Sequence, residues 1–141
     1  MKYFGDTNSN ISSIEGTTES LRILNERNNE RMKPIFEISF VELNADIINI
    51  QLIANNEGIK DSLKRFQEIV NSNEDYYLKL IKLGESIGSF LLRYGKIIVD
   101  DTDLKESVKI LLINYLDTIN KTNNQDLINS AINNVKSFLV A

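Results

Sequence analysis

The sequence predicts a mainly α-helical chain, folded as a single-domain bundle of about five helices with a long apolar central helix near residues 35–70. Apolar residues recur at every third or fourth position in almost every segment beyond residue 17, which is the spacing of one helix face. The 141 residues are 42% apolar and 26% charged, close to the average of one globular domain. Only one proline, Pro34, interrupts this pattern.

The domain organisation follows from where polar residues dominate. Residues 1–16 are rich in Gly, Ser, Thr and Asn and are predicted to form a flexible N-terminal tail. Residues 17–141 are predicted to form one helical domain, since they contain neither an internal repeat nor a linker long enough to divide them.

The first helical segment, residues 17–33, has few apolar residues, and these form a narrow seam with charges of both signs beside it. A seam of this kind typically meets one other helix, and an isolated helix of this length is only marginally stable in water. We therefore expect the segment to bind a partner or a second copy of the chain, and packing against a helix of the same chain is the alternative. The candidate partner-binding residues are Leu21, Leu24, Arg27, Arg31 and Met32.

Residues 35–54 carry two apolar stripes at helical spacing, with polar residues along the two edges between them. A helix that is apolar on two faces is typical of the middle of a bundle. The first stripe is Phe36, Phe40, Leu43, Ile47, Ile50 and Ala54, and the second is Ile38, Val41, Ala45, Ile48 and Leu52.

The same segment also fits an α+β alternative, in which residues 36–54 form a β-hairpin packed on helices. Apolar and polar residues alternate over 36–40 and over 48–52, and Asn44 to Asp46 would supply the turn. The helix is favoured because the second stripe continues in phase as far as Val70, whereas a lone hairpin needs further strands or a helix to cover it.

The later helices are predicted from their capping residues. Ser72 or Asn73 is expected to cap a helix over Glu74–Tyr94, and Gly95 is expected to end it. Within this helix, Gly84 and Gly88 are expected to allow a close crossing with a neighbouring helix.

Two further helices are expected to follow capping boxes, in which a side chain before the helix and one three residues later each bind the other's backbone. The first begins at Asp103 with Glu106, and the second at Thr122 with Gln125. Their expected core residues are Leu104, Val108, Leu111, Tyr115, Ile119, Leu127, Ala131, Val135 and Phe138.

The absence of His and Cys removes several kinds of chemistry. Ser-His-Asp and Cys-His triads are impossible, and so are zinc sites built on His or Cys. Asp100, Asp101 and Asp103 are interpreted as helix caps, because no Gly follows at the place where a calcium loop needs one. The sequence therefore predicts no catalytic residue, metal ligand or cofactor.

Charge and hydropathy limit where the protein can reside and which kinds of partner it can bind. The net charge is −4 and the basic residues are interleaved with acidic ones, whereas nucleic-acid binding needs a basic patch. No apolar run approaches the length of a membrane span, and the N-terminus lacks the apolar core of a signal peptide. We expect a cytoplasmic protein that does not bind nucleic acid and does not span a membrane.

These observations favour a non-catalytic helical protein–protein interaction module, such as an inhibitor, an adaptor or a chaperone-like accessory protein. Its partner is expected to be another protein or the chain itself. Two alternatives from other classes remain: an enzyme that uses a metal held by carboxylates alone, and a structural subunit that assembles with itself.

Overall fold

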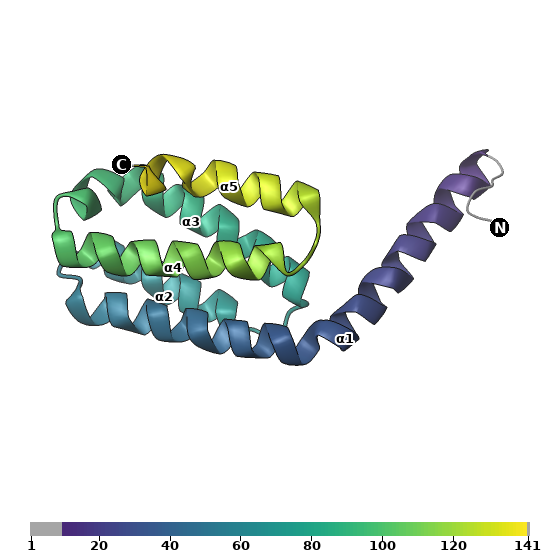
Figure 1. Cartoon of the computed structure of the whole chain (residues 1–141), viewed down its shortest axis with the longest axis horizontal. Helices are drawn as coiled ribbons and strands as arrows, with labels where there is room; N and C mark the ends of the chain where they lie inside the picture. Colours follow the sequence, from purple (N-terminus) through teal and green to yellow (C-terminus); the bar gives the residue numbers. More distant parts are fainter. Residues whose placement is uncertain (1–9, 141) are drawn as a thin grey trace. The chain divides into compact units, whose positions relative to one another are not determined.

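The computed structural model describes the backbone of residues 10–140 and the side chains of residues 31–140. The chain divides into two units, residues 1–34 and 35–141. The described residues form five helices and no strand, which confirms the all-α class and excludes the hairpin at 36–54 (Figure 1). The helices are α1 (Asn10–Ile53), α2 (Glu57–Val70), α3 (Tyr76–Val99), α4 (Thr102–Asn120) and α5 (Gln125–Leu139).

The predicted tail over residues 1–16 lies largely outside the described residues, since residues 1–9 are not described. The predicted domain from residue 17 onward also stays a prediction. The second unit begins directly after Pro34, whose ring removes the backbone N–H that would donate to the preceding helical turn.

Within the second unit, successive helices run antiparallel and bury a shared core. Helix α2 packs on α3, α3 packs on α4, and α5 lies against both α3 and α4 (Figure 1). From residue 35 onward α1 contacts two helices. Gln51 and Asp46 make hydrogen bonds to Gln67 of α2 and Asn114 of α4, with donor–acceptor distances of 3.2 and 2.7 Å. Helices α1 to α4 thus enclose the core, and α5 is added outside α3 and α4.

The first predicted stripe is the part of α1 that packs into this core. All six of its residues are buried, from Phe36 to Ala54. Phe36 and Phe40 both pack against the ring of Tyr76 at the start of α3, with ring centroids 5.6 Å apart in each pair. Full burial of such a side chain contributes roughly 1.5–3 kcal/mol, so this stripe is a main reason why α1 stays on the bundle.

The long helix predicted near 35–70 is interrupted at residues 54–56, which are not helical and separate α1 from α2. Asn56 has an extended backbone, and its side-chain oxygen accepts a hydrogen bond from the backbone N–H of Ile59 at 3.1 Å. This N-cap begins α2 and reverses the chain, so that Ile59, Leu63 and Phe66 enter the core from a second helix.

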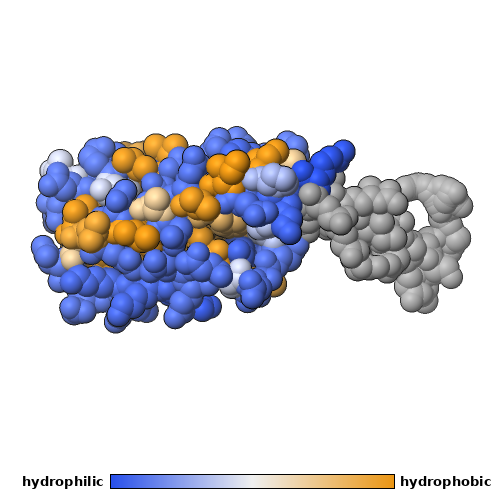
Figure 2. Space-filling view, turned by 90° about the horizontal axis from the view of Figure 1, so that it is seen from below, coloured by the Kyte–Doolittle hydropathy of each residue, from blue (hydrophilic) through white to orange (hydrophobic). Residues whose placement is uncertain are grey.

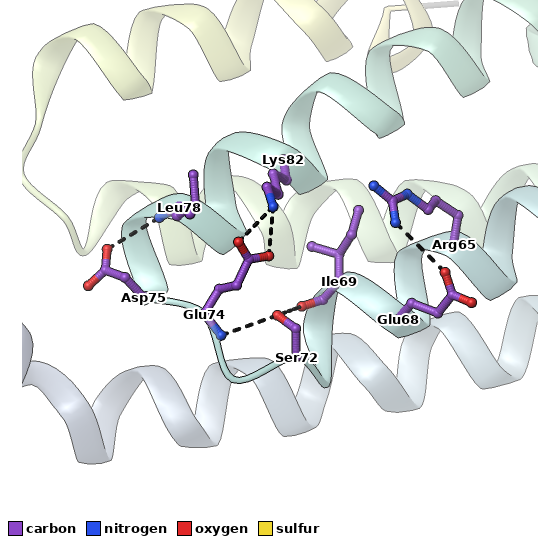
Figure 3. Close-up of polar contacts among 8 residues, drawn as sticks. All are labelled: Arg65, Glu68, Ile69, Ser72, Glu74, Asp75, Leu78 and Lys82. Carbon is purple, nitrogen blue, oxygen red and sulfur yellow. Dashed lines mark hydrogen bonds and ion pairs between the residues drawn. The ribbon is translucent and has the colours of Figure 1, made fainter.

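The cap of α3 differs from the prediction by two or three residues. Asp75, rather than Ser72 or Asn73, caps the helix: its carboxylate accepts from the backbone N–H of Leu78 at 3.3 Å (Figure 3) and from that of Tyr77 at 3.1 Å. The hydroxyl of Ser72 instead donates to the carbonyl of Ile69 at 2.9 Å and closes the end of α2. The short connection between α2 and α3 therefore contains two adjacent caps, one that ends α2 and one that begins α3.

Glu74, in the same connection, forms a polar clamp to α3. Its carboxylate accepts from the Lys82 ammonium at 2.8 and 2.6 Å (Figure 3). Both side chains are about one-third exposed, and solvent screening keeps such an ion pair's contribution small. The clamp orients the start of α3 more than it stabilises the fold.

Three further expectations about helix ends are wrong. Helix α3 continues through Gly95 to Val99, and no glycine in the described residues has a positive φ, the conformation that a glycine stop needs. Helix α4 is capped by Asp101, which accepts from the backbone N–H of Leu104 at 3.2 Å, so Asp103 lies inside the first turn. Helix α5 is capped by Asn124 and not by Thr122.

Gly84 confirms the close crossing predicted for α3. The Asn134 side chain of α5 donates to the Gly84 carbonyl at 3.3 Å, and the Tyr115 hydroxyl of α4 occupies the place that a Cβ at residue 84 would take. Burial raises the pKa of Tyr115 far above its usual range, so this hydroxyl stays neutral. Three helices therefore meet at a position where any residue larger than glycine requires Tyr115 to shift.

Candidate interaction surface

The second predicted stripe of α1 faces outward. Its members Ile38, Val41, Ala45, Ile48 and Leu52, hereafter the outer stripe, are all exposed. Val41 and Leu52 are 70% and 78% exposed. The expectation that both stripes are covered, as in the middle of a bundle, is therefore wrong for the described residues.

The position of α1 explains this exposure. On one side of the helix, Asn44 and Gln51 make hydrogen bonds to Asn71 and Gln67 at the end of α2. On the other side, Ser39 and Asp46 make hydrogen bonds to Lys121 and Asn114 of α4. The first stripe faces the core between these two rows, so the outer stripe lies on the opposite side of the helix.

Apolar residues of α4 extend the outer stripe. The bonds from Asn114 to Asp46 and from Lys121 to Ser39 fix the antiparallel register of the two helices, so that Ile113 lies level with Ile47 of α1. Ile110 and Ile113 are each more than half exposed. Figure 2 shows an interrupted band of apolar side chains along this face of the bundle, with hydrophilic side chains beside it.

Charged residues lie at both ends of the outer stripe. Glu37 and Glu42 are exposed beside Ile38 and Val41. At the other end, Lys60 and Lys64 of α2 share a helix face with Gln67, which contacts α1, and the exposed Glu57 and Asp61 lie beside them. The register of that contact places Lys64, one turn before Gln67, level with the last turn of α1.

Asp46 is the acidic group at the edge between α1 and α4. Burial raises the pKa of Asp46 from its usual value, the hydrogen bond from Asn114 lowers it, and the charge of Glu42 raises it. Its carboxylate is held by Asn114, so it fixes the helix pair rather than facing an open cleft.

Lys79 is the buried basic group of the bundle. Its ammonium donates to the Val70 carbonyl at 2.9 Å and lies 4.8 Å from the centre of the Phe40 ring. Burial lowers the pKa of Lys79, whereas the charge of Glu74 raises it. The ammonium thus closes the end of α2 and joins it to α3, and this contact gives it a structural role.

The predicted partner-binding residues fall mostly outside the described side chains. The backbone of α1 is helical throughout 17–33, but nothing is described of the side chains of Leu21, Leu24 and Arg27. Arg31 is exposed and Met32 is half-buried. The assignment of these five residues to a partner interface stays a prediction.

Sequence reasoning missed the outer stripe as a surface, although it identified all five residues. The three-four spacing was present in both stripes of α1, and nothing in the spacing says which stripe meets a neighbour. The sequence signal that distinguishes them is size: the buried stripe contains Phe36 and Phe40, whereas the outer one contains no aromatic residue and has Ala45 at its centre.

An open groove between α3 and α5 is a second exposed feature. It has a volume of about 930 Å³ and an apolar floor that includes Leu91, Val99 and Phe138, with Glu85 and Lys96 among the polar residues lining it. Leu92, at its edge, is 92% exposed. The groove carries no cluster of chemical groups that identifies a ligand.

Acidic residues of the described part of the chain do not gather into a group of three or more that could hold a metal ion. Asp101 caps α4, and Asp103 lies in the first turn, where its charge suits the positive end of the helix dipole. Among the described helices, none has the length and apolar character needed to cross a membrane. No protein family, characterised protein or solved structure compared with the chain matches it.

Proposed function

We propose that this chain is a non-catalytic helical protein-interaction module, and that the outer stripe of α1 binds a helix of its partner. The observation that carries the proposal is the pattern of exposure on α1. Five residues at three-four-three-four spacing, four of them large and apolar, face away from the core along a helix whose opposite face is fully buried.

The physical argument rests on the cost of leaving such a face in water. A scattered exposed Leu or Ile is ordinary, but a contiguous apolar strip on a rigid helix marks an interaction surface. The spacing is that of a coiled-coil seam, which fits a single helix laid alongside. Residues 38–52 present this seam over about 21 Å, at 1.5 Å per residue.

The surroundings of the outer stripe have the composition of an interface. Ile110 and Ile113 of α4 widen its apolar centre, and charged residues lie around its ends. An apolar core within a polar rim is the usual arrangement of a protein–protein interface. Inhibitors, adaptors and chaperone-like accessory proteins all use surfaces of this kind.

Photo-cross-linking tests the proposal. A photoreactive amino acid replaces Val41 in the outer stripe or, as a matched control, Leu92 at the edge of the α3–α5 groove; both positions are exposed on helices. In the native host, we expect position 41 to give a discrete covalent adduct with a protein and position 92 to give little. Adducts no more abundant at position 41 than at position 92 would contradict the assignment of the outer stripe.

A further inference from the structure

We infer that the partner of the outer stripe is a second copy of this chain, bound antiparallel about a two-fold axis that passes near Ala45. This inference rests on the proposed function and names its partner. It is carried by two properties of the described residues: the near symmetry of the apolar positions, and the opposite charges of Glu37 at one end of the stripe and Lys64 at the other.

The apolar positions are nearly symmetric about Ala45. Val41 and Ile48 lie four residues before and three residues after it, and Ile38 and Leu52 lie seven residues to either side. An antiparallel two-fold axis brings the Ile38 end of one copy onto the Leu52 end of the other. The small side chain of Ala45 then lies at the centre of the crossing, where it allows the two helices to approach closely.

The charges are complementary in this arrangement. A two-fold axis in the plane of the interface, perpendicular to α1, keeps the α2 side of one copy next to the α2 side of the other. Glu37 lies at the Ile38 end of one copy. It therefore faces the last turn of α1 in the second copy, where Lys64 of that second copy lies nearby. The symmetry produces this pair twice in each dimer.

The parallel arrangement is disfavoured by the same charges. In a parallel coiled coil with Ile38 and Val41 at core positions, Glu37 of one helix flanks the seam opposite Glu42 of the other. Two carboxylates would then face each other on both sides of the seam, and like charges across an interface are unfavourable. The acidic residues thus select the antiparallel orientation.

The apolar residues of α4 are also covered in the antiparallel dimer. Ile113 lies close to the level of Ala45 because of the register between α4 and α1. The two-fold axis therefore brings Ile113 close to Ile113 of the second copy. The exposed Ile110 and Ile113 of α4 then lie on the face that the second copy covers.

Charge exchange tests the arrangement in the full chain. The variants Glu37→Lys and Lys64→Glu each change an exposed residue, and circular dichroism checks that each remains helical. We expect the wild-type molar mass to rise with concentration from that of one chain, 16.1 kDa, towards that of two. Each variant alone should dimerise about tenfold more weakly, since two attractive pairs become repulsive.

Mixing the two variants gives the decisive comparison. In a mixed dimer, position 37 of each copy again faces the opposite charge at position 64 of the other. Both attractive pairs therefore return, and the mixture should dimerise about as well as the wild type. A mixture as weak as its components would overturn the antiparallel arrangement. A wild-type chain that stays at 16.1 kDa at all concentrations would overturn the second copy as partner. An adduct at position 41 with a different protein would then still support the proposed function.

Discussion

Replacing Leu111 by alanine should lower the free energy of unfolding by roughly 2–5 kcal/mol. Leu111 is fully buried in α4, which packs against α1, α3 and α5, so its removal leaves a cavity that three neighbouring helices cannot easily fill. Urea unfolding followed by circular dichroism measures the change, with both proteins at the same low concentration.

The control for Leu111 is Ile132→Ala in α5, which removes a branched apolar side chain that is 43% exposed. This change should cost much less than the substitution at Leu111, because the side chain already contacts water. A loss below about 1 kcal/mol at Leu111 would contradict its position at the centre of the core.

Adding one methyl group at Gly84 should also destabilise the bundle, by about 1–3 kcal/mol. The new Cβ of Gly84→Ala would collide with the hydroxyl of Tyr115, whose ring is buried and cannot rotate away without disturbing the core. The matched control is Gly95→Ala in the same helix, where no atom lies within 4 Å of the new Cβ. That change should stabilise the protein by up to about 1 kcal/mol, the helix preference of Ala over Gly.

A double substitution assigns the effect at Gly84 to its cause. Tyr115→Phe removes the hydroxyl that the new methyl group meets, so it should recover a large part of the stability lost in Gly84→Ala. Thermal or chemical unfolding of the two single variants and the double variant measures the coupling. Additive losses would show that the Tyr115 hydroxyl does not limit the approach of α4 to α3 at Gly84.

The helical class and most of the core residues were predictable because the spacing of apolar residues reflects both directly. In α4, the residues Leu104, Val108, Leu111, Tyr115 and Ile119 share one face by spacing, and all are buried. Of the four positions expected inside α5, Ala131, Val135 and Phe138 are buried and Leu127 is half-buried. For helices with a single stripe, only one face can be the core.

The helix ends were less predictable, because several capping residues lie next to one another in this Asn-rich chain. Ser72, Asn73 and Asp75 can all accept from a helix N-terminus, and the packing of α3 decides that Asp75 does so. Gly95 has the residue type of a helix stop. The helix nevertheless continues for another turn, which places Ile98 in the core.

The interaction surface could not be predicted from the sequence, for a different reason. Helix α1 has two apolar stripes of equal spacing, and either could face the core. Only the placement of α2 and α4, fixed by contacts such as those of Gln51 and Asp46, decides which stripe is covered. That choice depends on residues distant in the chain, so local spacing does not contain it.

The most direct test of the outer stripe is whether protein covers it in the native setting. The chain contains no cysteine, so Val41→Cys and Leu92→Cys each introduce a single labelling site on an exposed helical position. In an extract of the native host, we predict that a bulky maleimide reacts more slowly at position 41 than at position 92, with equal rates once the protein is unfolded. Reaction at position 41 as fast as at position 92 in the native extract would contradict the account.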